Sequence, residues 1–198
     1  MSERVLGLGL VEIFVFATLL AGALATAEKR HQLIGIGMLA ILSGGAQLAW
    51  MLSANQSILY AFLALTLVFY AAVASVLVLA LFRRGTSITM DTMCSAVSVY
   101  LLLGLIWAMA YAILELAVPG SFSFPANEIG NEQQFDRFLG FSLTTLTTLG
   151  YGNVAPATLR ADALSTLEAV CGQVYLAVVI ARLVALQILQ RDQYAKDS

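Results

Sequence analysis

The sequence predicts an all-α integral membrane protein with five transmembrane helices and one re-entrant helix in each subunit. Of its 198 residues, 60% are hydrophobic and only 11% are charged, whereas soluble domains carry about 25% charge. The hydrophobic residues form five stretches close to the roughly 20 residues needed to cross a bilayer. A sixth apolar stretch is too short to span. Together these observations exclude a soluble domain.

The five predicted spans are separated by short polar breaks. They are residues 5–26, 33–53, 58–82, 94–118 and 163–190. The first stretch ends in a run that resembles a signal-peptide cleavage site, but it contains Glu12 and is longer than the apolar part of a signal peptide. We therefore expect five spans, the first of them included.

Basic residues predict the orientation of the spans. Lys29-Arg30 and Arg83-Arg84 follow alternate spans, and loops rich in lysine and arginine stay on the cytoplasmic side. This places the N-terminus outside and the C-terminal tail, residues 191–198, in the cytoplasm. We expect a multi-pass protein of the cell membrane.

Residues 135–148 form the short apolar stretch, whose length fits a re-entrant helix. Asn131 and Gln134 form a plausible capping pair at its start. The helix would enter from outside and end at Thr147 or Thr148, and the chain would return through residues 149–152. Irregular backbone at that depth must be buried in protein or line a wet cavity, so this segment should face other subunits rather than lipid.

The returning segment carries glycine at alternate positions, Gly150 and Gly152. In an extended strand successive carbonyls point to opposite sides. Left-handed backbone at alternate residues turns them to one side, and glycine adopts that conformation at least cost. A row of carbonyls can replace the water around a dehydrated cation.

The run Thr147-Thr148-Leu149-Gly150-Tyr151-Gly152 resembles the selectivity-filter signature of tetrameric potassium channels, with Leu149 in the usual valine or isoleucine place. Pro156 follows at the family's spacing, and the likeness covers residues 94–190. It implies a homotetramer around a central pore, with residues 93–190 as the pore domain. The apolar stretches before it predict residues 1–92 as a three-helix N-terminal transmembrane domain of unrecognised type, and residues 191–198 are the tail.

The resemblance also implies where potassium binds. The ion would contact the backbone carbonyls of Thr148, Leu149, Gly150 and Tyr151, with Gly152 closing the motif. The Thr148 hydroxyl would add the innermost ring, and the Tyr151 side chain would brace the filter against the pore helix. Potassium is the permeant ion, and no cofactor is implied.

Two positions depart from the family pattern. Asn153 stands where many members carry aspartate, and Thr144 stands where some prokaryotic members carry glutamate. Both remain candidates for supporting the filter, but we expect no carboxyl pair behind it. Selectivity should not depend on such a pair, because the ion-binding oxygens belong to the backbone.

Two glutamates lie in the predicted spans of this half. Glu168 is a functional candidate, because an intramembrane carboxylate is costly. It could lie behind the filter and bond hydroxyls such as those of Ser142 or Thr145. The alternative is a satisfied inter-helix contact without a role in gating. For Glu115 we expect an interface contact.

The last span holds the remaining candidates. Gly172 is either a hinge for pore opening or a glycine that allows helices to pack closely. Gln173, Leu176 and Ile180 share a helix face, which by the resemblance lines the cavity. The alternative for that face is contact with lipid or another helix.

The sequence thus predicts a potassium-selective channel rather than an enzyme. Its expected partners are further copies of the chain and membrane lipids, with no nucleic acid and no soluble ligand-binding domain in the chain. Three alternatives remain: a weakly selective cation channel, a non-conducting regulatory subunit of a related channel, and a secondary transporter. Against the transporter, only one re-entrant segment is predicted, whereas that fold usually shows paired halves.

Overall fold

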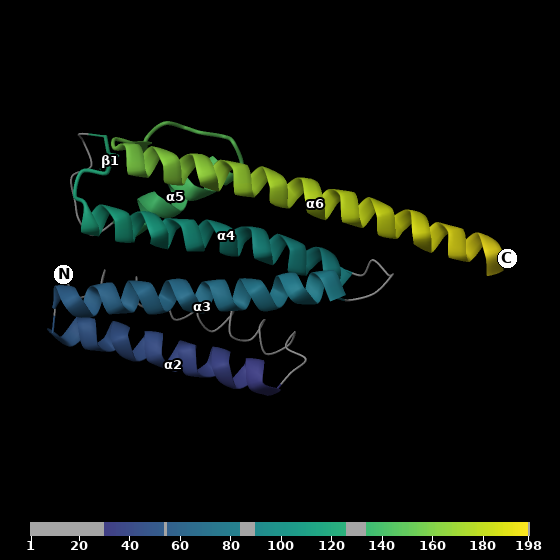
Figure 1. Cartoon of the computed structure of the whole chain (residues 1–198), viewed down its shortest axis with the longest axis horizontal. Helices are drawn as coiled ribbons and strands as arrows, with labels where there is room; N and C mark the ends of the chain where they lie inside the picture. Colours follow the sequence, from purple (N-terminus) through teal and green to yellow (C-terminus); the bar gives the residue numbers. More distant parts are fainter. Residues whose placement is uncertain (1–29, 54, 84–89, 126–133, 198) are drawn as a thin grey trace. The chain divides into compact units, whose positions relative to one another are not determined.

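A computed structural model describes residues 30–53, 55–83, 90–125 and 134–197. These residues are mostly helical (Figure 1). The helices are α2 (Arg30–Ser53), α3 (Gln56–Arg83), α4 (Met90–Ala117), α5 (Gln134–Leu146) and α6 (Leu159–Asp197), and the strands are β1 (Phe122–Ser123) and β2 (Ala155–Pro156). The predicted span 5–26 and the predicted cap residue Asn131 lie outside the described residues.

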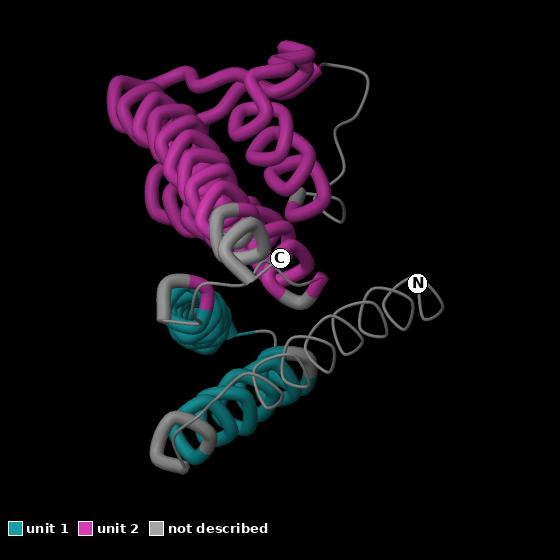
Figure 2. Tube along the Cα trace, turned by 90° about the vertical axis from the view of Figure 1, so that its right-hand side faces the viewer, with its two compact units in different colours: residues 1–80 teal, residues 81–198 magenta. Residues whose placement is uncertain are grey.

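The chain divides into two compact units between Ala80 and Leu81 (Figure 2). The described part of the first unit contains α2 and most of α3. The second unit contains α4, α5, α6 and both strands. The predicted domain boundary at residues 92–93 is not tested by this division and stays a prediction.

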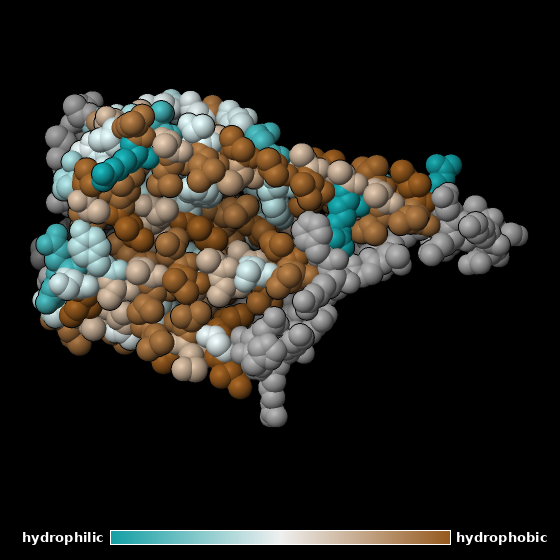
Figure 3. Space-filling view, in the orientation of Figure 1, coloured by the Kyte–Doolittle hydropathy of each residue, from teal (hydrophilic) through white to brown (hydrophobic). Residues whose placement is uncertain are grey.

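Three of the described helices are long and apolar enough to cross a membrane: Gln56–Leu81, Thr92–Ala117 and Leu159–Leu189. Hydrophobic side chains cover much of the α6 surface in view (Figure 3). In α2 the described apolar stretch is Ile34–Trp50. This stretch lies within the predicted span 33–53, and the number of five spans stays a prediction.

The helix starts follow ordinary capping chemistry. At α3, the Asn55 side-chain oxygen accepts a hydrogen bond from the Ser57 amide at 3.0 Å. At α6, the Thr158 hydroxyl accepts one from the Ala161 amide at 3.3 Å. Each bond satisfies an amide that lacks a partner within its helix. No glycine or proline interrupts α6 after Gly172, so the helix continues to Asp197 and includes most of the predicted tail.

Within the second unit, α5 packs between α4 and α6 (Figure 1). Its last turn contacts Gly104 of α4 and Gly172 of α6. Gly104 is 13 residues before the end of α4, which is about 20 Å at 1.5 Å per residue. Helix α5 therefore ends about half way along the apolar length of α4. This is the depth expected of a re-entrant helix.

The end of this unit where α4 finishes and α6 begins is closed by two short strands that the sequence did not predict. Strand β1, after α4, pairs antiparallel with β2, with Phe122 opposite Pro156 and Ser123 opposite Ala155. The Ala157 amide also donates to the Ser121 carbonyl at 2.8 Å. The loop after α4 is thereby tied to the segment that leads into α6.

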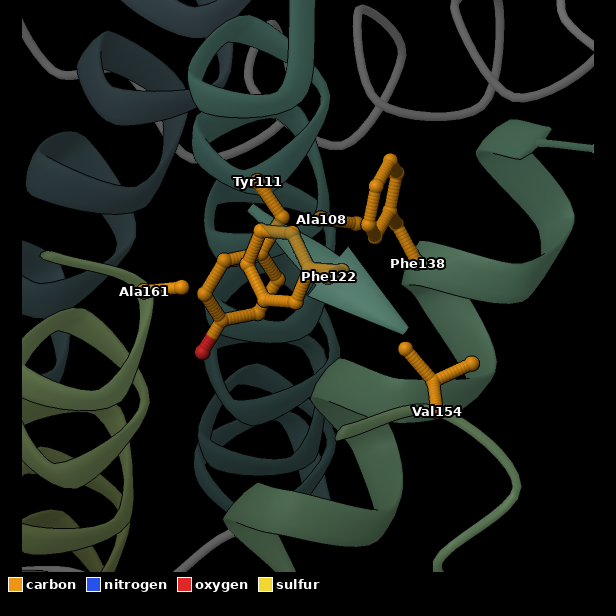
Figure 4. Close-up of a cluster of buried hydrophobic side chains, with 6 residues drawn as sticks. All are labelled: Ala108, Tyr111, Phe122, Phe138, Val154 and Ala161. Atoms are coloured by element: carbon orange, nitrogen blue, oxygen red, sulfur yellow. The ribbon is translucent and has the colours of Figure 1, made fainter. Parts of the chain in front are cut away.

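A buried aromatic cluster that includes Phe122 of β1 joins these elements (Figure 4). Tyr111 of α4, Phe122 of β1 and Phe138 of α5 are all buried, and Val154 and Ala161 complete the cluster with Ala108. The Phe122 ring meets the Tyr111 and Phe138 rings edge-on, with centroids 5.1 Å apart in both pairs. Such pairs stabilise by about 0.5–1.5 kcal/mol beyond the apolar area they bury.

Candidate functional site

Helix α5 ends in a Schellman turn. The Leu149 amide donates to the Thr144 carbonyl at 2.8 Å, and the Thr148 amide donates to the Thr145 carbonyl at 3.0 Å. This pair of bonds defines the motif, and it requires left-handed backbone at the residue just past the helix end. That residue is Thr148, whose φ is +57°. The helix thus stops at Leu146, one or two residues earlier than predicted.

A left-handed threonine is unusual. Glycine is the common residue at this position of the turn, and a β-branched side chain with positive φ is a true backbone outlier. Such strain costs about 1–3 kcal/mol and gathers at functional sites, where the surrounding structure enforces it. The strain at Thr148 therefore marks this turn as a candidate site.

Left-handed residues then recur at every second position. Gly150 has φ of +56° and Gly152 has φ of +76°, so the left-handed backbone predicted at the two glycines is confirmed. Thr148 adds a third left-handed residue at the same spacing, which the sequence did not reveal. This alternation is the backbone geometry that turns successive carbonyls to one side of the chain.

The side chains of this segment face outward from the chain. Leu149 is 56% exposed and Tyr151 is 75% exposed, while Val154 just beyond is buried in the aromatic cluster. The segment is thus anchored at both ends and open between them. Tyr151 was predicted to brace the filter against the pore helix. Within one chain its side chain makes little contact of this kind, because three-quarters of it is exposed.

Leu146 anchors the start of this segment. Its side chain is fully buried, and its Cδ2 atom and backbone lie so close to Gly172 that a Cβ there would be 2.8 Å from Cδ2 and 3.0 Å from the carbonyl oxygen. On the other side, the Tyr100 hydroxyl donates to this carbonyl at 2.8 Å. The Tyr100 ring stacks on Tyr175 with centroids 5.9 Å apart. A helix-end carbonyl that would lack a partner is thereby satisfied by α4.

These contacts bear on two predictions. At Gly172 the geometry matches close helix packing, one of the two alternatives, and the hinge stays a prediction. Thr144 supports the segment through its backbone carbonyl, which accepts from the amides of Leu149 and Gly150 at 2.8 and 3.2 Å. Its hydroxyl donates instead to the Phe141 carbonyl of its own helix.

Glu168 of α6 contacts α5 and is fully buried. One carboxyl oxygen bonds the Tyr111 hydroxyl and the other bonds the Ser142 hydroxyl. The Ser142 contact is one of the two that the sequence suggested. Thr145, the other candidate, donates to Phe141 in its own helix. The carboxyl group therefore joins α4, α5 and α6.

Glu115 supports the turn between α4 and β1. Its Oε1 accepts from the Gly120 amide at 2.8 Å and its Oε2 from the Phe122 amide at 3.0 Å. The predicted interface contact is therefore a cap on the turn that leads into β1. Because β1 pairs with β2, these hydrogen bonds of Glu115 also help to hold β2, the strand that follows the exposed segment at residues 147–153.

The predicted cavity face lies on the exposed part of α6. Gln173 and Ile180 are exposed and Leu176 is half-buried. The buried stripe of α6 contains Glu168 and Gly172, and the three predicted residues lie about a quarter turn from it at 3.6 residues per turn. Gln173 and Ile180, and the exposed part of Leu176, are thus available for a contact outside the chain. Asn153 is likewise exposed.

Sequence reasoning missed Tyr100, Tyr111 and Tyr175. Each is a tyrosine in an apolar helix whose hydroxyl bonds a partner on another helix; that of Tyr175 donates to the Ala96 carbonyl at 2.6 Å. A buried tyrosine hydroxyl usually finds a partner, so three tyrosines in two apolar helices were the available signal. Within the described residues no group of three or more His, Cys, Asp or Glu could hold a metal ion, so side-chain metal ligation finds no support there.

Comparison with known proteins agrees with this geometry. Residues 99–187 match a family model described as an ion channel. That match runs from α4 into α6 and contains the whole candidate site, while α2 and α3 lie outside it. It supports a membrane protein with an ion-channel pore in this part of the chain.

One curated relative sharpens the similarity. The inward rectifier potassium channel Kirbac3.1 of Paramagnetospirillum magnetotacticum is 39% identical over 83 residues, which are 40% of this chain and 24% of that protein. The chain therefore spans about a quarter of the length of the relative it matches. No solved structure matches the chain. The similarity supports a pore of the potassium channel kind.

Proposed function

We propose that the chain is the subunit of a homotetrameric, potassium-selective channel that conducts passively. The observation that carries this proposal is the left-handed backbone at Thr148, Gly150 and Gly152, directly after a helix that ends half way along its neighbour. The ion would bind the carbonyls of Thr148, Leu149, Gly150 and Tyr151. The ion-channel match and the potassium channel relative support the same reading.

The exposed filter segment argues for several copies. Peptide groups without partners are costly in hydrocarbon, so irregular backbone at that depth must meet protein or water. Within the chain, Leu149 and Tyr151 are largely exposed. Four copies with closed symmetry would bury these side chains against one another and turn the carbonyls into rings around one axis. Tyr151 would then brace the filter against a neighbouring copy.

The remaining features complete the proposal. The long apolar helices would cross the cell membrane, with lipid around them, the N-terminus outside and the end of α6 in the cytoplasm. Helices α2 and α3 would belong to a peripheral domain. Gln173, Leu176 and Ile180 would line the cavity below the filter.

Reversal potentials test the proposal. The purified full chain is inserted in planar bilayers with potassium chloride on one side and sodium chloride on the other. For a potassium-selective channel, the current reverses at a voltage at which the potassium chloride side is negative. This reversal potential shifts when the potassium gradient is changed. A reversal potential near zero would instead favour the weakly selective cation channel. Reproducible absence of current would favour the non-conducting subunit.

Tyr151→Asp tests the filter itself. Loss of the ring and addition of a carboxylate in each copy should abolish the preference for potassium over sodium while current persists. Ser98→Ala is the matched control, because the Ser98 hydroxyl is exposed and donates to the Cys94 carbonyl of its own helix. A Tyr151→Asp channel with the wild-type reversal potential would contradict the assignment.

Cavity lining is tested by cysteine accessibility. In a background with Cys94→Ala and Cys171→Ala, a charged thiol reagent applied from the cytoplasmic side should block Gln173→Cys channels. Val170→Cys, also exposed but turned roughly 60° further round the helix at 100° per residue, is the comparison. Equal block of both, or block of neither, would remove Gln173 from the cavity.

A further inference from the structure

The buried carboxyl group of Glu168 belongs to a chain of oxygen contacts across three helices. Its Oε2 contacts the Tyr111 hydroxyl of α4, and its Oε1 contacts the Ser142 hydroxyl of α5. The Ser142 Oγ also lies 2.8 Å from the Gly104 carbonyl oxygen of α4. The contacts thus run from Tyr111 through Glu168 and Ser142 to Gly104.

Counting hydrogens in this chain gives the protonation state. Three oxygen–oxygen contacts need three hydrogens, one in each. The Tyr111 and Ser142 hydroxyls bring one hydrogen each, and the Gly104 carbonyl brings none. The third must come from Glu168. With that proton, Glu168 donates to Ser142, Ser142 donates to Gly104, and Tyr111 donates to Glu168, so every contact is a hydrogen bond.

An ionised Glu168 cannot satisfy the same geometry. A carboxylate only accepts, so both hydroxyls would turn their hydrogens toward it. The oxygens of Ser142 and Gly104 would then face each other 2.8 Å apart with no hydrogen between them, and they would repel. The charge would also be fully buried, where a carboxylate with only hydroxyl partners is costly.

We propose that Glu168 holds its proton and acts as a positioning residue, because that proton completes the hydrogen bonds that fasten α5 to α4 and α6. Ser142 lies one helical turn before Leu146, the residue seated between Gly104 and Gly172. The neutral acid therefore fixes the last turn of α5, and with it the start of the segment at Thr148. Its effect on conduction rests on the proposed function, whereas its protonation does not.

Infrared difference spectroscopy of the purified full chain in lipid tests the protonation. The difference between wild type and Glu168→Gln should show the carbonyl stretch of a protonated carboxylic acid, which shifts in deuterated water. Glu115→Gln is the matched control, because both Glu115 oxygens accept from backbone amides and need no proton. Absence of the acid band from the Glu168→Gln difference spectrum would overturn the proposal.

Substitutions test the positioning role. In Glu168→Gln the amide donates to Ser142 and its oxygen accepts from Tyr111, as the neutral acid does, so the thermal midpoint of the channel and its reversal potential should match wild type. Glu168→Ala and Ser142→Ala should lower the midpoint and shift the reversal potential toward zero, whereas Ser98→Ala should do neither. If Glu168→Gln behaves like Glu168→Ala, a carboxylate is needed and the proposal is wrong.

The two arms separate this inference from the function. A protein that shows the acid band but carries no potassium current keeps the protonated Glu168 and loses the channel proposal. A selective channel without the band keeps the channel and loses the inference.

Discussion

The open segment at residues 147–153 and the three-helix contact behind it differ in what their residues contribute. In the open segment the backbone is the distinctive part, with left-handed residues at Thr148, Gly150 and Gly152 and the side chains of Leu149 and Tyr151 largely exposed. Next to it, side chains make the contacts: hydroxyl and carboxyl groups form hydrogen bonds between α4, α5 and α6.

This difference predicts two kinds of failure. A change in the open segment should alter ion selectivity with a modest loss of stability, because little else in the chain packs on it. A change behind the segment should lower stability first and alter selectivity through the displaced end of α5. The three substitutions that follow test this contrast.

Gly172→Ala should have the largest effect on stability. The new methyl group would lie 3.0 Å from the Leu146 carbonyl oxygen and 3.3 Å from its Cα atom, so α5 or α6 must shift. Overpacking of this kind costs about 1–3 kcal/mol, measured as the free energy of unfolding in detergent micelles. Gly140→Ala is the control, because its methyl group meets nothing within 4 Å and alanine favours the helix. Equal stability of both variants would contradict the close packing.

Gly150→Ala should have an intermediate effect on stability and a complete one on selectivity. No atom lies within 4 Å of the added methyl group, so the cost is that of left-handed backbone, about 1–2 kcal/mol. If the residue relaxes to negative φ, its carbonyl turns away and the preference for potassium should be lost. Bilayer reversal potentials measure this, and an unchanged value would separate selectivity from the backbone alternation.

Tyr100→Phe should have the smallest effect. It removes one hydrogen bond to the Leu146 carbonyl, worth about 0.5–1.5 kcal/mol. Tyr175→Phe removes a bond of the same kind, which joins α6 to the Ala96 carbonyl of α4 rather than to α5. Stability should fall similarly in both, whereas only Tyr100→Phe should shift the reversal potential. A shift of equal size in both variants would show that the end of α5 has no special role.

The same contrast explains what could be predicted from the sequence. The long apolar helices and the short helix α5 follow from apolar runs of given length, and the left-handed backbone at Gly150 and Gly152 follows from glycine spacing. These are local signals. The left-handed backbone of Thr148 could not be predicted, because threonine carries no sequence signal for positive φ. Its conformation is imposed by the hydrogen bonds that close the helix end.

Long-range contacts could not be predicted for a different reason. Tyr111 and Glu168 are 57 residues apart, and Tyr100 and Leu146 are 46 apart. Several hydroxyl groups in apolar helices are chemically equivalent, so Ser142 and Thr145 were equal candidates for the hydrogen-bond partner of Glu168. Strands β1 and β2 have only two residues each, too few for a periodic pattern, and they form because Glu115 and Ser121 bind the backbone there.

The most direct test of the central claim is a cryo-electron microscopy structure of the full chain in lipid nanodiscs containing potassium. The account predicts a fourfold particle in which the carbonyls of residues 148–151 face a common axis that carries ion density. A particle in which this segment faces lipid, or one without a central conduit, would contradict it.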